Sequence, residues 1–203
     1  MEVPLHLPIK ITFFNQLLFD TPLLRNLIER AGTFRAFHRA KISFSSQGVH
    51  FALFQKYGRT DSKVLDLGIS CRPSDWQLSS IAQVIRASIP PFPTLECLEL
   101  RDHHPLQHWQ DDIENAQWLE LLRLFAFVKD LVLCGQLVGH VAPVLGELIG
   151  ERVAEELPAL QNIFVEDPLP SGSHPWKKEI GQFITARQIS GTPVAVHHAI
   201  NSF

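Results

Sequence analysis

Histidine and aspartate side chains gather at one place in this sequence, in the stretch 101–112. The stretch contains three histidines and two adjacent aspartates, namely His103, His104, His108, Asp111 and Asp112. Their donor atoms could converge within about 2.0 to 2.2 Å of one metal ion. Pro105, however, breaks the helix that would place His104 and His108 on one face, and acidic pairs are common at helix starts. We therefore predict a solvated histidine loop without a metal, and a small metal-dependent hydrolase using this loop is the alternative function.

The serines lack the partners that nucleophilic catalysis requires. Ser173 and His174 are neighbours, but they lie in a turn rich in proline and glycine, and no Gly-x-Ser-x-Gly elbow occurs in the sequence. The glycines between positions 135 and 150 are not followed by the Gly-Lys-Ser/Thr of a phosphate loop. We therefore predict a protein that is not an enzyme and that has no cofactor.

The composition is that of a folded chain with a nearly even charge balance. Of 203 residues, 45% are hydrophobic, and 18 lysines and arginines against 21 aspartates and glutamates give a net charge of −3. This content is enough for a continuous core. Because lysine and arginine are not clustered, we expect no binding to nucleic acid.

The chain also lacks the patterns of export and of membrane insertion. Glu2 and two prolines stand where a signal peptide needs cations and an unbroken apolar stretch. The longest uncharged run, Leu131–Gly146, is too short to span a bilayer. Cys71, Cys97 and Cys134 fit neither a zinc site nor a disulfide framework. We therefore expect reduced thiols in a cytoplasmic or nuclear protein, with no membrane partner.

A repeated pattern indicates how the chain is organised. Leu95–Leu100, Val128–Leu133 and Leu160–Val165 superpose without gaps and share the order apolar-x-x-apolar-x-apolar. The same frame includes Val64–Leu67 and Val194–Val196. The matched positions are spaced by 33, 33, 32 and 31 residues and are Leu65, Leu98, Leu131, Ile163 and Val194. Such a period is typical of stacked structural repeats.

Segments with helical periodicity separate these predicted strands. The expected helices are 76–89, ended by Pro90 and Pro91, and three more at about 111–125, 141–156 and 175–188. Ser74 and Gln77 fit a capping box at the start of the first helix. In the second helix, apolar residues recur every three positions and predict one apolar face, made by Ile113, Ala116, Leu119, Leu122 and Phe125.

Strands and helices alternating at a period of about 32 residues predict an α/β fold of the leucine-rich-repeat-like solenoid type. In this fold a parallel sheet carries its helices on the convex side. We expect a single repeat domain over 1–203, with irregular repeats in 1–60 and regular strand-helix repeats in 61–203. Upstream strands are expected at 9–13 and 41–44, with an inserted strand at 49–54. A closed, doubly wound α/β domain is the main alternative.

The repeat frame also predicts which side chains point out of the concave side of the sheet, where solenoids usually bind. One column would be Asp66, Glu99, Val132, Phe164 and Ala195, a second Val64, Cys97, Asp130 and Asn162, and a third Gly68, Arg101, Cys134, Glu166 and His197. The candidate partner-binding residues are Asp66, Glu99, Arg101, Asp130, Val132, Asn162, Phe164 and Glu166. A strip that is acidic at one end and apolar at the other would suit a peptide with cations and an apolar anchor. Coverage of Val132 and Phe164 by a loop or a neighbouring chain is the alternative.

Several strings of the sequence resemble the C-terminal region of a large group of basidiomycete F-box-type proteins. These strings are Ser70–Ser80, His108–Glu114, Gln117–Leu122, Ala142–Leu145, Glu147–Leu148, Leu157–Gln161 and Ile180–Phe183. The resemblance extends over roughly residues 9 to 197. It implies a leucine-rich-repeat-like domain that, in longer relatives, follows an F-box.

The resemblance also implies a function in protein binding. The F-box of such proteins docks onto the Skp1 adaptor of a cullin-type ubiquitin ligase, and the repeats hold the protein to be ubiquitinated. Here the first 30 residues predict a strand and a single helix, Asn15–Arg30, without an F-box-like bundle. We therefore expect an unknown protein partner, with Skp1 and cullin as partners only if an F-box exists upstream. The remaining alternative is a degenerate structural fragment without a ligand.

Overall fold

A mixed β-sheet with helices on one side forms the body of the molecule. The computed structural model describes residues 9–14, 24–26, 37–57, 60–70, 74–89, 91, 93–103, 115–150, 152–166 and 176–198. Of the expected helix Asn15–Arg30, residues 24–26 are described and are helical, and the rest lies outside the described residues.

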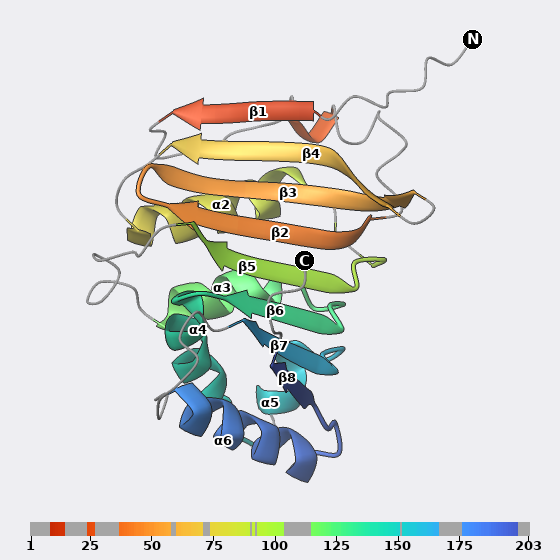
Figure 1. Ribbon diagram of the computed structural model, residues 1–203, viewed down its shortest axis with the longest axis vertical. Helices are drawn as coiled ribbons and strands as arrows, with labels where there is room; N and C mark the ends of the chain where they lie inside the picture. Colours follow the sequence, from red (N-terminus) through yellow and green to blue (C-terminus); the bar gives the residue numbers. More distant parts are fainter. Residues whose placement is uncertain are drawn as a thin grey trace.

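The sheet contains eight strands in the described part of the chain (Figure 1). They are β1 (Ile9–Phe14), β2 (Phe37–Ser45), β3 (Gly48–Tyr57), β4 (Thr60–Ser70), β5 (Cys97–Asp102), β6 (Asp130–Cys134), β7 (Asn162–Glu166) and β8 (Ala195–His198), and their order in the sheet is β1-β4-β3-β2-β5-β6-β7-β8. Strands β2, β3 and β4 form an antiparallel meander, whereas all the other neighbouring pairs are parallel. The predicted α/β class with a largely parallel sheet is therefore confirmed.

The order of the strands differs from the repeat frame at one place. The spacing from Leu65 to Leu98 predicts that β4 and β5 are neighbours, but β3 and β2 lie between them. The parallel neighbour of β5 is β2, whose Ala40 lies opposite Leu98. The expected inserted strand at 49–54 is present as β3 and pairs with β2 on one side and β4 on the other. The even spacing thus continues across this meander although the strand neighbours change.

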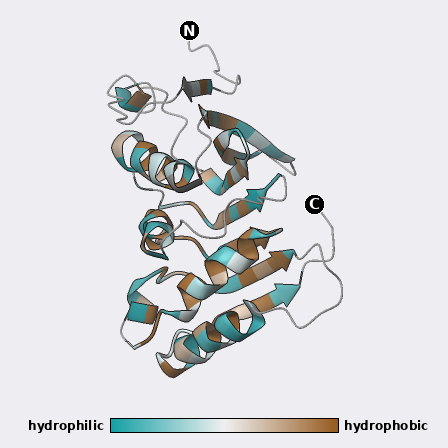
Figure 2. Cartoon of the chain, turned by 90° about the vertical axis from the view of Figure 1, so that its left-hand side faces the viewer, coloured by the Kyte–Doolittle hydropathy of each residue, from teal (hydrophilic) through white to brown (hydrophobic). Residues whose placement is uncertain are grey.

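The described helices cover one face of the sheet, as Figure 2 shows from the side. They are α2 (Ser74–Ser88), α3 (Asn115–Arg123), α4 (Leu137–Gly146), α5 (Arg152–Glu155) and α6 (Trp176–Ile189). Between the helices and the sheet the buried side chains form one continuous core that extends along the chain from Leu24 to Val194. Aromatic contacts link the meander to α3: Phe44 meets Trp118 edge to face at 5.8 Å between ring centroids, and Phe51 lies 6.4 Å from Phe125.

Two of the helix predictions need correction. The helix expected at 141–156 is divided into α4, which begins already at Leu137, and the single turn of α5. Pro143 therefore lies inside α4 rather than in its first turn. In α3 the buried face repeats at the ordinary helical period and contains Trp118, Leu119, Leu121 and Leu122, whereas Ala116 is exposed. A spacing of exactly three residues drifts around a helix of 3.6 residues per turn, so it could not stay on one face.

Capping of α2 also differs from the prediction in the part that the structure describes. The Gln77 side chain is buried, and its Nε2 donates a hydrogen bond to the Ser45 carbonyl oxygen at 2.9 Å. The side chain of Ser74 lies outside the described residues. Gln77 thus connects α2 to the end of β2.

A buried arginine joins α6 to the preceding segment. Arg187 donates from Nη1 to the Val153 carbonyl oxygen at 3.0 Å and from Nη2 to the Leu160 carbonyl oxygen at 2.8 Å. Its side chain is almost inaccessible to water, and this burial lowers the pKa of the guanidinium from its ordinary value. Because these carbonyls stand at the end of α5 and just before β7, Arg187 holds the last helix in place.

Candidate interaction surface

The face of the sheet opposite the described helices, called here the open face, carries the predicted partner-binding residues. Side chains alternate between the two faces of a strand. Leu98, Leu131 and Ile163 lie opposite one another in the core, so the residues next to them point to the open face. The pairing register gives a central column across all eight strands, namely Lys10, Asp66, Ala52, Lys41, Glu99, Val132, Phe164 and His197.

Glu99 is the centre of an ion cluster on this face. Its carboxylate accepts contacts from Arg39 through Nη2, from Lys41 Nζ at 3.0 Å, and from Arg101 Nε at 3.0 Å. Burial by itself would raise the pKa of the Glu99 carboxyl, but hydrogen bonds from Arg39 and Lys41 hold that pKa down at about 2. The Glu99 side chain is only 2% exposed, whereas its three cationic partners are each more than a quarter exposed.

Arg101 extends this cluster over the neighbouring strand. Its Nη2 atom donates to Glu166 Oε2 on β7 at 2.9 Å, across Cys134 of β6. Cys134 is buried beneath this pair, and burial raises the pKa of its thiol to about 12. Burial likewise raises the pKa of the Cys97 thiol to about 11. Both described cysteines are free thiols, and such high pKa values make them poor nucleophiles near neutral pH.

An apolar and aromatic strip lies beside the ion cluster, towards the β8 edge. Val132 and Phe164 are partly exposed and lie opposite each other, and the Phe164 ring stacks on the His197 ring at 4.8 Å between centroids. His197 Nε2 lies 3.3 Å from Asn162 Oδ1. Asn162 in turn donates from Nδ2 to Asp130 Oδ1 at 2.8 Å, so the polar groups next to the strip are already hydrogen-bonded.

The acidic end that the sequence predicts for this surface is not present as an acidic patch. Glu99 is enclosed by three cations, and Asp66 pairs with Lys63 at 3.2 Å. Asp66 does share the central column with Glu99, but Ala52 and Lys41 of the meander lie between them. The carboxylates of the open face are therefore neutralised by neighbouring side chains rather than offered to a ligand.

The last strand has a different register from the predicted one. Val196, not Val194, lies opposite Ile163. Ala195 consequently belongs beside Asn162, and His197 belongs beside Phe164. The two columns exchange these members because the strand after α6 begins two residues later than the equal spacing implies.

Sequence reasoning missed three residues of this surface, Arg39, Lys41 and His197. Arg39 and Lys41 alternate with the buried Ala40 and Ile42, which is the pattern of a half-buried strand and could have been recognised. That pattern does not reveal that β2 lies next to β5. His197 could have been found by testing a shift of two residues at the last repeat.

The histidine loop lies almost entirely outside the described residues. His103 is described and is exposed at the end of β5, whereas His104 and His108 fall in the undescribed stretch 104–114. Within the described ranges no group of three or more histidines, cysteines, aspartates or glutamates is placed to hold a metal ion. Among the helices described above, none is both long enough and apolar enough to cross a membrane.

Comparison of this chain with protein-family models, with curated proteins and with solved structures found no match. The surface must therefore be interpreted from its own chemistry.

Proposed function

We propose that this chain is a non-enzymatic protein-interaction domain of the leucine-rich-repeat-like solenoid type, and that it binds a protein partner on its open face. The proposal is carried by the strip of Val132, Phe164 and His197. This strip is partly exposed on the sheet face opposite the described helices, and it adjoins charges that are already paired. Aromatic and aliphatic groups surrounded by satisfied polar groups are typical of the centre of a protein interface.

The register of β5 to β8 supports the solenoid part of the proposal. Leu98, Leu131 and Ile163 are direct neighbours across three parallel strands, so their regular spacing in the sequence corresponds to stacking in space. Helices α3, α4 and α6 follow this part of the sheet on its other face (Figure 1). In a solenoid this arrangement makes the sheet the concave, binding side.

The resemblance to basidiomycete F-box-type proteins suggests what the partner would be. If an F-box upstream recruits Skp1 and cullin, the bound protein would be a target of ubiquitination. Binding is favoured over catalysis here because the pKa of Glu99 is held at about 2, which leaves no proton for acid-base chemistry near neutral pH.

Substitution of Phe164 tests this proposal. Affinity capture from cells that produce the chain should give a set of saturable partners, which purified proteins then confirm in titrations. Phe164→Thr removes the aromatic anchor but keeps a residue suited to a strand, and it should weaken binding roughly 10- to 30-fold. Phe127→Thr is the matched control, because Phe127 is an exposed aromatic in the turn before β6. Equal affinity of the two variants for every partner, or no saturable partner, would contradict the proposal.

A further inference from the structure

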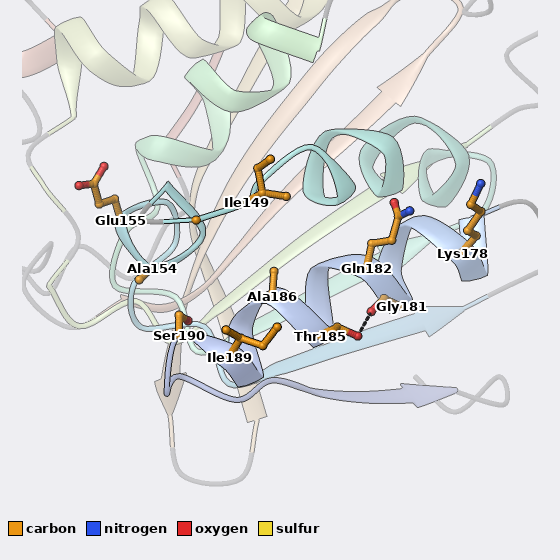
Figure 3. A pocket seen from close by; sticks show the side chains of 11 residues that line it. Ile149, Ala154, Glu155, Lys178, Gly181, Gln182, Thr185, Ala186, Ile189 and Ser190 are labelled. Atoms are coloured by element: carbon orange, nitrogen blue, oxygen red, sulfur yellow. Dashed lines mark hydrogen bonds between the residues drawn. The ribbon is translucent and has the colours of Figure 1, made fainter.

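A second apolar surface lies on the helix side of the molecule, away from the open face. It is a groove with a volume of about 1200 Å³ between α6 and the segment that follows α4 (Figure 3). Ile149 and Ala154 line it from that segment, and Gly181, Thr185 and Ile189 line it from α6. The groove shares none of its lining residues with the open face, so its role does not rest on the function proposed above.

The two isoleucines of this groove are unusually exposed. Ile189 is 82% exposed and Ile149 is 69% exposed, more than the other exposed large hydrophobic residues of the described part, Trp76 and Phe127. A branched aliphatic side chain gains free energy when it is removed from water. Two such residues lining one apolar groove therefore indicate a surface that becomes covered.

The outer side of α6 allows another helix to approach closely. Gly181 and Thr185 follow each other by one turn, and a Cβ atom added at Gly181 would meet nothing within 4 Å. Thr185 donates its hydroxyl to the Gly181 carbonyl oxygen at 2.9 Å (Figure 3). Because that hydroxyl is satisfied within the helix, Thr185 needs no polar partner in the groove.

Opposite charges mark the two ends of the groove. Glu155 lies at one end and Lys178 at the other (Figure 3), and neither makes an ion pair with the described residues. A helix that fills the groove should therefore present a cation near Glu155, an anion near Lys178, and an apolar residue over Gly181. Helix α6 of a second copy, lying antiparallel, meets these requirements. It brings its Lys178 to the first copy's Glu155 and its Ile189 over Gly181.

We propose that the chain forms a twofold symmetric dimer through this groove, with the α6 helices of the two copies packed antiparallel. A twofold interface uses the same surface on both copies. Each ion pair between Lys178 and Glu155 therefore occurs twice, and both Ile189 side chains become buried. Self-complementary charge is the property that favours a second copy over an unrelated partner helix.

Sedimentation equilibrium of the purified full chain over a concentration series tests the dimer. Ile189→Asp should raise the dimer dissociation constant roughly 100-fold, because two buried isoleucines are lost. Phe127→Asp, which changes an exposed aromatic outside the groove, should leave that constant unchanged. Far-UV circular dichroism of both variants checks that they fold, which an exposed position such as Ile189 permits.

Charge reversal identifies the antiparallel arrangement itself. Lys178→Glu alone and Glu155→Lys alone should each raise the dissociation constant roughly 5- to 10-fold, because both ion pairs become repulsive. The double variant with both changes should return to the wild-type constant. An equimolar mixture of the two single variants should form heterodimers in preference to homodimers, because only the mixed pair has two attractive contacts.

A wild-type chain that stays monomeric up to about 100 µM, well above the micromolar range of weak specific dimers, would overturn the proposal. A dimer that Ile189→Asp does not weaken, or that shows no rescue by the double charge reversal, would overturn it as well. Binding of a foreign amphipathic helix in this groove by a monomeric chain would assign the groove to another partner. None of these outcomes affects the test on Phe164, since that test measures binding at the open face.

Discussion

Glu99 decides the charge arrangement of the open face. Its carboxylate is the common partner of Arg39, Lys41 and Arg101, and it is buried while they are partly exposed. Its pKa in the folded chain, about 2, lies below its ordinary value of 4.5. A carboxyl group with a depressed pKa stabilises the fold above its unfolded pKa, and this stabilisation is lost as the pH falls through the folded pKa. The contribution is at most about 3 kcal/mol at neutral pH and decreases between about pH 5 and pH 2.

We therefore expect Glu99→Gln to destabilise the chain by about 2 to 4 kcal/mol at pH 7, because three cations lose their common partner. The difference from wild type should become smaller as the pH is lowered from 5 towards 2, where the wild-type carboxyl also becomes neutral. Urea denaturation followed by circular dichroism at several pH values measures both effects.

Glu120→Gln is the control for this prediction. Glu120 is about half exposed, and its contact with Arg86 Nη2 is 3.9 Å long, so its loss should cost less than about 0.5 kcal/mol. If Glu99→Gln were as mild as this control, or if its effect did not depend on pH, the cluster would not stabilise the fold.

At the scale of elements, the contact between α4 and α6 depends on a glycine at the end of α4. A Cβ atom built on Gly146 would lie 3.0 Å from the Glu179 Cβ and 3.2 Å from the Glu179 Cα and carbonyl oxygen of α6. Gly139, two turns earlier in the same helix, has nothing within 4 Å of such an atom. The two glycines of α4 thus have the same helical context but different surroundings.

Alanine substitutions at these glycines should therefore have opposite effects. Gly139→Ala should stabilise the chain by about 0.5 to 1 kcal/mol, because alanine loses less backbone freedom in a helix. Gly146→Ala should destabilise it by about 1 to 2 kcal/mol, because α6 must move away. Thermal unfolding of the two variants measures the difference. Stabilisation by both substitutions would show that the helices do not pack as closely as described.

At the scale of the whole molecule, the continuous core couples the antiparallel meander to the parallel part of the sheet. The contacts of Phe44 with Trp118 and of Phe51 with Phe125 cross from the meander to α3. All four side chains are at most 1% exposed. Neither part can therefore lose its structure without exposing apolar surface of the other.

We accordingly expect unfolding in a single transition over the described body of the protein. Tryptophan fluorescence, which reports on Trp118 of α3 and Trp176 of α6, should change at the same denaturant concentration as far-UV circular dichroism. Phe51→Leu should shift both curves equally, by about 1 kcal/mol. Two separate transitions, or a shift in only one of the two signals, would mean that the meander and the repeats unfold independently.

The dimer proposed above also belongs to this scale. If it forms, the transition midpoint should rise with protein concentration, since association stabilises the folded state by mass action.

Much of the local structure could be predicted from the sequence. The strands at 95–100, 128–133 and 160–165 were found from their repeated apolar pattern, within two residues of β5, β6 and β7. The position of α6 followed from its helical period. Local patterns sufficed here because the side-chain period of a strand or helix follows from its own backbone geometry.

For the candidate surface the sequence went only part of the way. It placed Glu99, Val132 and Phe164 in one column of side chains, as the register now shows. It did not place Arg39 and Lys41 beside Glu99, because they belong to a strand some 60 residues earlier in the chain. It therefore predicted an acidic surface where the charges are in fact paired.

The sequence by itself thus determined the types of element, their period and the inward or outward direction of most strand residues. Only the tertiary structure decided the order of the strands, the shift of β8 by two residues and the partners of the buried charge. The physical reason is that patterning is a local property of the backbone. Which strands become neighbours depends instead on contacts between distant segments, whose combined burial must outweigh the entropy of closing the chain between them.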